Sequence, residues 1–508
     1  MGLCLEKKGM DFMQRQLLKQ PSILNQLILV CGLGLLLGIA SIRLPTYLLL
    51  IGIAGIIYVV VAWLRPEIAV LGILVMTSTI FDMNLLPSIS IGIGHILIPD
   101  ILLFVLFGII LLRGMVESKS YFIHTVLDFP LFAFYVTAIF STVIAIFNSS
   151  ITFNQSLGEV RIINFFLTFF IVTNLLRNEK QLHRLFNGII FLAIIVALAM
   201  IAQYILGPSV PILPGRVETL DTAGTTSYGV ARILPPGQSL VMLAFVCLIV
   251  QMLFDKTSPR FVLYLIQLGI IGLAVLLTFN RSFWTAITLS LFLVSLLVSF
   301  RDKVKYAKIV FWAILVGAIV FTPFLSIKGG MAEKLMNGIM IRMSSLFNPN
   351  TTQESSLVYR YVENEYAYPQ IASHPLLGLG LGANYRPLDH RIDFGPADSI
   401  LRYYIHNGHL WVILKTGLIG YLFFMWFILL FVKRGLQNWK RIPDPFLKGI
   451  VLSFIAMIPG ILLASTIDPI FKQSWWTPVI GIMLGISEVI LRMSNNQFKD
   501  SQILKELN

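Results

Sequence analysis

The sequence predicts an all-α integral membrane protein, a polytopic helical bundle of about 12 to 14 transmembrane helices with one long extracytoplasmic loop that contains short helices. Of its 508 residues, 57% are hydrophobic and only 12% are charged, and the mean hydropathy is +0.83. Apolar runs of about 18 or more residues recur along the whole chain, long enough to cross the hydrocarbon layer. A soluble globular domain carries about 25% charged residues, so that class is excluded.

Fourteen apolar segments are candidate spans. In chain order they are residues 24–41, 46–63, 67–82, 96–112, 128–147, 157–176, 185–206, 237–254, 261–279, 283–300, 308–326, 408–432, 447–468 and 475–492. The weakest of them is 67–82, because four polar residues, Thr77, Ser78, Thr79 and Asp82, shorten its apolar run. Without this span, the orientation of everything upstream would be inverted.

The distribution of basic residues predicts the orientation. If the spans alternate from an inside N-terminus, 23 of the 38 lysines and arginines fall in the two termini and the short loops on one side. Cytoplasmic loops carry such an excess of Lys and Arg. We therefore expect both termini in the cytoplasm, and we expect the two long loops, 207–236 and 327–405, on the outer side of the membrane.

Four regions follow from this topology. Residues 1–206 and 406–508 form N-terminal and C-terminal transmembrane helices, 207–326 form transmembrane helices with arginines at their outer ends, and 327–405 form the long periplasmic or extracellular loop. This loop begins with two amphipathic patterns, Met331 to Met343 and Ser355 to Ser373. Pro369 should bend or end the second helix.

Composition excludes several functions. The net charge is +13, but the basic residues lie in clusters between apolar runs rather than in one patch, so we expect no nucleic-acid partner. The three cysteines, Cys4, Cys31 and Cys247, are isolated in the sequence. They predict neither a disulfide framework nor a cysteine-based metal site.

Two motif-like strings have simpler explanations than a cofactor site. Gly378-x-Gly380-x-Gly382 lacks the preceding strand that a dinucleotide fingerprint requires, so we expect a flexible loop that packs closely against another segment. His406-x-x-His409 could place two imidazoles on one helical face, but no carboxylate neighbour completes a zinc shell. We therefore predict no metal and no cofactor.

Arginines at the outer ends of apolar runs are the strongest candidates for function, since a charge near hydrocarbon is costly and normally has a partner or a role. For Arg161 the nearby Glu159 favours a structural explanation. Arg281 differs, because the turn Asn280-Arg281-Ser282 between two spans is so short that its guanidinium has little room to reach bulk water. We expect a functional role for Arg281.

Several segments together resemble the shared core of the O-antigen ligase and O-antigen polymerase superfamily, over residues 232 to 432. They are Asn280-Arg281-Ser282 before an apolar helix, Arg360 ahead of Pro375-Leu-Leu-Gly378-Leu-Gly380, His406-Asn407-x-x-Leu410, and Gly417-x-x-Gly420. Asn280 and Ser282 depart from the Ser and Gly common in the family, and Lys415 stands where an acidic residue is often found. These departures remove no proposed catalytic group, and we expect Lys415 to face a polar cavity or another helix.

The resemblance implies a glycosyltransferase of the bacterial cytoplasmic (inner) membrane, with an active site that faces the periplasm or exterior. Such enzymes build lipopolysaccharide and other cell-envelope polysaccharides by transferring a glycan from undecaprenyl diphosphate to a glycan or lipid acceptor. It also implies that Arg281 and Arg360 hold the diphosphate, with Arg232 in support, and that His406 is the catalytic base. Asn407 and Tyr404 are possible supporting residues.

Glycan transfer from a diphosphate requires these residue types independently of the family resemblance. A sugar linked to a diphosphate has a good leaving group, so an enzyme must mainly stabilise the charge on the departing phosphate and deprotonate the acceptor hydroxyl. Arginine donates in pairs to phosphate and can replace a divalent cation, and an imidazole can accept a proton near neutral pH. A single displacement would invert the anomeric centre.

The alternative function is a flippase or transporter of lipid-linked oligosaccharide, which could also need arginines and many helices. A carrier should place polar residues near the midplane in both halves of the chain. Here they concentrate on the outer side of the second half, which favours the enzyme over the carrier and over a purely structural scaffold. Ligase and polymerase share the donor chemistry, so both remain open.

Overall fold

The computed structural model describes residues 46–81, 88–90, 94–116, 122–207, 210–213, 217–219, 231–254, 258–325, 331–344, 355–389, 391 and 401–506. Residues 1–64 and 65–508 form two separate compact units. In the first unit the described element is the helix α3 (Thr46–Leu64). The expected span 24–41 lies outside the described residues.

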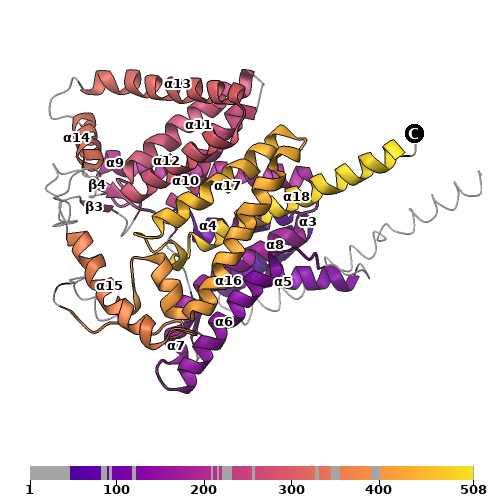
Figure 1. The fold of residues 1–508 in the computed structure, drawn as a ribbon. Coiled ribbons are helices and arrows are strands. Elements are labelled where there is room, and N and C mark those ends of the chain that lie inside the picture. The colour runs from indigo at the N-terminus through magenta and orange to yellow at the C-terminus, as the bar shows by residue number, and fades with distance from the viewer. Residues whose placement is uncertain are drawn as a thin grey trace, which may run out of the picture. The chain divides into compact units, whose positions relative to one another are not determined.

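The second unit is built from helices (Figure 1). In chain order they are α4 (Pro66–Thr77), α5 (Ile98–Val116), α6 (Asp128–Phe147), α7 (Phe153–Asn164), η2 (Phe165–Leu167), α8 (Thr168–Leu175), α9 (Glu179–Leu206), α10 (Gln238–Phe254), α11 (Ser258–Leu277), α12 (Arg281–Leu297), α13 (Phe300–Leu325), α14 (Met331–Ser344), α15 (Ser355–Ser373), η5 (Leu401–Tyr403), α16 (Gly408–Asn438), η6 (Trp439–Arg441), α17 (Pro445–Ala464), η7 (Ile470–Lys472) and α18 (Thr477–Glu506).

Within the described residues, seven helices are long and apolar enough to cross a membrane. They are Ile98–Val116, Asp128–Phe147, Phe153–Leu175, Glu179–Leu206, Gly408–Arg441, Pro445–Ala464 and Thr477–Asn495. Shorter apolar helices accompany them over Gly52–Leu64, Pro66–Thr77, Gln238–Phe254, Phe261–Leu277 and Arg281–Leu297. The predicted all-α polytopic membrane fold is confirmed, while the total of 12 to 14 spans stays a prediction.

Polar residues explain where the helices depart from the expected spans. The span expected at 67–82 ends at Thr77, whose hydroxyl donates to Ile73 O at 2.8 Å, while the Ser78 hydroxyl donates to Trp475 O at 2.9 Å.

Two short antiparallel hairpins were not expected: β1 (Ser88–Ser90) with β2 (His95–Leu97), and β3 (Val217–Thr219) with β4 (Ala231–Ile233). Both expected loop helices are present as α14 and α15, and Pro369 lies inside α15 without ending it.

The core of the second unit forms where helices distant in sequence pack together. In Figure 1, α16 lies beside α6, and α12 packs against α17. Phe134 of α6 and Phe424 of α16 meet with ring centroids 5.2 Å apart, and Phe166 contacts both rings. At the other contact Gly460 of α17 lies so close to the backbone of Ala286 in α12 that a Cβ would come within 2.5 Å of its carbonyl oxygen. Only glycine permits this approach.

Helix α16 is broken at Gly417, whose φ of 65° lies in the left-handed region. The loop that follows α15 fills this break. Its backbone bonds to that of α16: Leu418 N to Pro375 O (2.8 Å), Ile419 N to Leu376 O (3.3 Å), Leu379 N to Leu414 O (2.7 Å) and Gly380 N to Lys415 O (3.1 Å). Backbone groups freed at membrane depth must find partners within the protein, and this loop supplies them.

Glycines make this junction possible. Gly378, Gly380 and Gly382 all have positive φ, and a Cβ on Gly378 would come within 2.6 Å of Gly417 N. A Cβ on Gly382 would come within 2.5 Å of Gln155 O in α7. The close packing expected of this loop is therefore confirmed. The junction places the end of α15 and the start of α16 next to each other.

Candidate functional site

The turn Asn280-Arg281-Ser282 begins α12 and is tied to the connection between α17 and α18. Asn280 is the N-cap residue, and its side-chain oxygen accepts the Ser282 backbone N–H at 3.2 Å. The Asp468 carboxylate accepts hydrogen bonds from the Asn280 side-chain amide, at 3.4 Å, and from the Ser282 hydroxyl. Arg281 is the first residue of the helix and its side chain is partly buried. Asp468 therefore holds the turn that carries Arg281.

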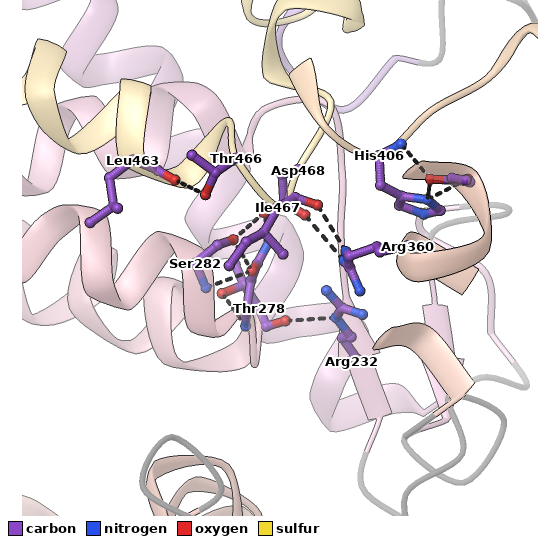
Figure 2. Close-up of polar contacts among 11 residues, drawn as sticks. Arg232, Thr278, Ser282, Arg360, His406, Leu463, Thr466, Ile467 and Asp468 are labelled. Atoms are coloured by element: carbon purple, nitrogen blue, oxygen red, sulfur yellow. Dashed lines mark hydrogen bonds and ion pairs between the residues drawn. The ribbon is translucent and has the colours of Figure 1, made fainter. Parts of the chain in front are cut away.

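Arg360 and Arg232 come from different elements to the same place. Arg360, on α15, donates from Nε to Ile467 O at 2.9 Å, and its terminal nitrogen lies 3.9 Å from the Asp468 carboxylate. Arg232, on β4, donates from Nε to Thr278 O at 3.2 Å. In Figure 2 the two guanidinium groups point toward one another. An anion between two such cations would be bound by both, and phosphate suits this geometry.

His406 is held by a carboxylate on α15. Its Nδ1 lies 2.9 Å from Oε1 of Glu363, and Glu363 Oε2 accepts the His406 backbone N–H at 2.8 Å (Figure 2). Glu363 is 1% exposed and lies three residues after Arg360, so both side chains leave the same face of the helix. One helix therefore carries a cation of the site and the carboxylate that orients its histidine.

The two expected supporting residues have clear structural positions. The Tyr404 and His406 rings meet edge to face, with centroids 4.8 Å apart. Asn407 is the N-cap of α16, and its side-chain oxygen accepts the Leu410 backbone N–H at 3.1 Å. This cap fixes where α16 begins, directly after His406.

His409 lies one turn beyond His406 but faces another helix. Its Nε2 lies 2.9 Å from Leu462 O in α17, and the Tyr421 hydroxyl lies 3.2 Å from its Nδ1. Both ring nitrogens therefore have protein partners. In the part of the chain that the structure describes, no group of three or more His, Cys, Asp or Glu residues could hold a metal ion.

The partner expected for Arg161 was wrong. Arg161 pairs with Asp100 at 2.8 Å, whereas Glu159 is buried and lies 3.2 Å from the ammonium of Lys415. The same carboxylate accepts the Gly382 backbone N–H at 2.6 Å and the Trp411 indole N–H at 2.9 Å. Lys415 thus faces another helix and ties α16 to α7 beside the glycine loop. Sequence proximity misled because Glu159 and Arg161 are two residues apart on a helix and do not share a face.

A second lysine lies close to the candidate base. Lys472, in η7, places its ammonium over the rings of Tyr403 and Tyr404, 4.2 and 4.1 Å from their centroids. Burial lowers the pKa of Lys472 to about 7. Tyr385 donates its hydroxyl to Tyr404 O at 3.0 Å, and burial raises the pKa of Tyr385.

An ion network fixes the loop beyond α15. Arg391 contacts Asp389 at 2.7 Å and Glu365 of α15 at 3.0 Å, and the Tyr366 hydroxyl donates to Asp389 at 2.8 Å. Hydrogen bonds from Arg391 hold the pKa of Asp389 well below its usual range. The loop is thereby fastened to the helix that carries Arg360 and Glu363.

Part of the chain matches a known protein family. Residues 266–425 match the family model described as O-Antigen ligase. The chain carries an O-antigen ligase domain. The resemblance to the O-antigen ligase and polymerase superfamily is confirmed. No curated protein matches the chain.

The O-antigen ligase domain contains only part of the site. Arg281, Arg360, Glu363 and His406 lie within the matched residues, and Arg232 lies before them. Two further charged residues that contact the site, Asp468 and Lys472, follow the matched segment. The family indicates a membrane glycosyltransferase-like function in surface-polysaccharide synthesis, with lipid-linked glycans as substrates.

Sequence reasoning missed Glu363, Asp468 and Lys472. A signal existed for each. Glu363 follows Arg360 at the i, i+3 spacing of a predicted helix. Asp468 and Lys472 are charged residues between two apolar spans, where a charge normally has a partner or a role.

Proposed function

We propose that the protein transfers a glycan from an undecaprenyl-diphosphate-linked donor to an acceptor hydroxyl on the outer face of the cytoplasmic membrane. His406 is the base, and Arg281, Arg360 and Arg232 bind the diphosphate. The reaction is a single displacement that inverts the anomeric centre, and the arginines supply the positive charge that other enzymes take from a divalent metal. The family match over 266–425 supports this chemistry at the level of the reaction class.

The observation that carries the proposal is the pair of His406 and Glu363. A proton on Nδ1, 2.9 Å from the carboxylate, leaves Nε2 as the accepting nitrogen of the neutral ring. When Nε2 takes the acceptor proton, the carboxylate stabilises the imidazolium that forms. The Glu363 side chain is 1% exposed, so little water screens the attraction between the carboxylate and the imidazolium.

The contacts of the arginines support a role in binding the leaving group. Arg360 is one helical turn from Glu363, and its guanidinium faces that of Arg232 (Figure 2). Arg281 is carried by the turn that Asp468 holds, and Asp468 also lies 3.9 Å from Arg360. A bound diphosphate would relieve the repulsion between these cations and be oriented with its sugar toward His406.

Purified protein with a lipid-linked glycan donor and an acceptor glycan tests the function. We expect a product whose new linkage has the opposite anomeric configuration to the donor, formed in the presence of EDTA. Movement of intact donor across a proteoliposome membrane without any new glycosidic bond would instead indicate a flippase.

The acceptor is tested in the native host. Deletion of the protein followed by glycan gel analysis separates the two reactions of the superfamily. Long chains that are no longer attached indicate a ligase, and single repeat units indicate a polymerase. An unchanged glycan pattern would contradict the proposal.

A further inference from the structure

Lys472 lies between the helical body and the segment that carries the histidine. Lys472 is the last residue of η7, which packs against α16, α18 and α7, and it is only 8% exposed. Its ammonium lies 4.2 Å from the ring centroid of Tyr403 and 4.1 Å from that of Tyr404. A desolvated cation this close to two aromatic faces is attracted by both rings.

The aromatic contact continues to the candidate base. Tyr404 meets His406 edge to face at 4.8 Å, and His406 is bonded to Glu363 through both its ring and its backbone. The contacts therefore run from Lys472 through Tyr404 to the imidazole. Residues 403–406 are held on one side by the ammonium and on the other by the carboxylate.

Charged groups on three elements act on Lys472. Burial lowers its pKa to about 7, Glu159 of α7 and Glu363 of α15 oppose the shift, and Lys415 of α16 adds to it. A further titratable neighbour is His409 of α16, whose ring meets that of Phe471 at 5.4 Å. The ammonium therefore gives way to a neutral amine within the pH range in which transfer can be assayed.

We propose that Lys472 is a positioning residue for His406: its ammonium holds the faces of Tyr403 and Tyr404 and so keeps the imidazole on Glu363 in the geometry that transfer needs. The inference rests on the proposed function. A neutral amine loses the attraction to the ring faces, so residues 403–406 become less well held. A shift of about 1 Å at a reacting group can cost ~10² in rate.

The pH dependence distinguishes this role from simple packing. In the wild type, transfer should fall on the alkaline side as Lys472 loses its proton. Lys472→Arg keeps the charge at every accessible pH, so the alkaline decline in its pH–rate profile should move to higher pH. Lys472→Met keeps the length but has no charge, so transfer should be roughly tenfold or more below wild type and should show no alkaline limb from this residue.

A second measurement needs no substrate. Full-length protein in lipid nanodiscs is treated with diethyl pyrocarbonate, and the modification rate of His406 is read by peptide mass spectrometry. Relative to wild type at the same pH, the rate should rise in Lys472→Met and Tyr403→Leu and stay unchanged in Tyr403→Phe, which keeps the aromatic face. Lys448→Met, at the opposite end of α17, is the matched control and should match wild type.

The two measurements separate two kinds of failure. If no glycan is transferred by any form but the labelling differs as described, the proposed function is wrong and the positioning role stands. If Lys472→Met keeps both the wild-type labelling rate and the wild-type alkaline limb, the positioning role is wrong. Should Lys472→Arg fail to fold, the Tyr403→Phe and Tyr403→Leu pair still decides the outcome.

Discussion

The imidazole Nδ1 of His406 lies 2.9 Å from Oε1 of Glu363, and the other carboxylate oxygen accepts the backbone N–H of the same histidine at 2.8 Å. A single buried side chain thus fixes the position, the ring orientation and the tautomer of the candidate base. Glu363 and Arg360 both lie on α15, one helical turn apart. Movement of α15 would therefore shift the carboxylate and the guanidinium together.

Glu363→Gln should lower transfer strongly. The amide keeps the size of the side chain but loses the negative charge that stabilises the imidazolium and can favour the wrong tautomer. We expect kcat to fall by ~10² to 10⁴, as for loss of general-base assistance, with donor binding retained. Glu365→Gln, two residues further on, is the matched control. It loses one exposed ion pair to Arg391, which stays paired with Asp389 at 2.7 Å, so transfer should stay within about twofold. Wild-type kcat in Glu363→Gln would show that the carboxylate is not used.

The arginines should be sensitive to shape as well as charge. Arg281→Ala and Arg360→Ala should nearly abolish transfer, and the corresponding lysine variants should also be poor, because a point charge loses the paired donors of the guanidinium. Arg161→Ala should be milder, since Arg161 forms an ion pair with Asp100, with the two groups 2.8 Å apart. Initial rates with purified variants measure this. Full activity in both lysine variants would mean that diphosphate is not bound by paired donors.

Gly417→Ala should destabilise the protein. Its φ of 65° is unfavourable for alanine, which costs about 1 to 3 kcal/mol, and the added Cβ would lie 2.1 Å from Leu376 O. Gly108→Ala in α5 is the control, because nothing lies within 4 Å of its Cβ position. Thermal unfolding in detergent should show a lower midpoint for Gly417→Ala only. Equal midpoints would mean that the loop can leave the break without cost.

The orientation in the membrane is tested with two single cysteines in a cysteine-free background. Ser345→Cys and Asn495→Cys should be labelled by an impermeant reagent from opposite sides, the first from outside and the second from the cytoplasm, as the basic-residue bias predicts. Labelling of both from outside would overturn the predicted topology.

The sequence predicted the helices well because apolar runs follow directly from the hydrocarbon layer. Expected spans such as 128–147 and 185–206 correspond to α6 and to the larger part of α9. Hydropathy did not predict that α16 is interrupted at Gly417, since the segment as a whole stays apolar despite Lys415 and Thr416. The break depends on hydrogen bonds to a loop some 40 residues earlier in the chain, and only the folded structure shows them.

The candidate site was predicted by residue type and not by partner. His406 and Arg360 were expected from the resemblance to the family, but the carboxylate that orients His406 was not. The i, i+3 spacing places Glu363 on the helix face of Arg360 and does not tell which acidic residue reaches the histidine. Glu159 shows the same difficulty from the other side: it was expected near Arg161 and is instead 3.2 Å from Lys415. Pairing depends on which helices pack together, and adjacency in sequence does not determine that.

The last prediction separates a base from a metal ligand at the start of α16. His406→Ala should leave folding and donor binding intact while transfer falls by ~10² or more. His409 is held between Leu462 O at 2.9 Å and the Tyr421 hydroxyl at 3.2 Å, so His409→Gln, which can keep one of these hydrogen bonds, should retain most activity. A zinc pair would need both histidines. Transfer should also persist in excess EDTA, since the arginines supply the charge a cation otherwise would. Chelator-sensitive transfer that is lost equally in His406→Ala and His409→Gln would exclude the metal-free mechanism.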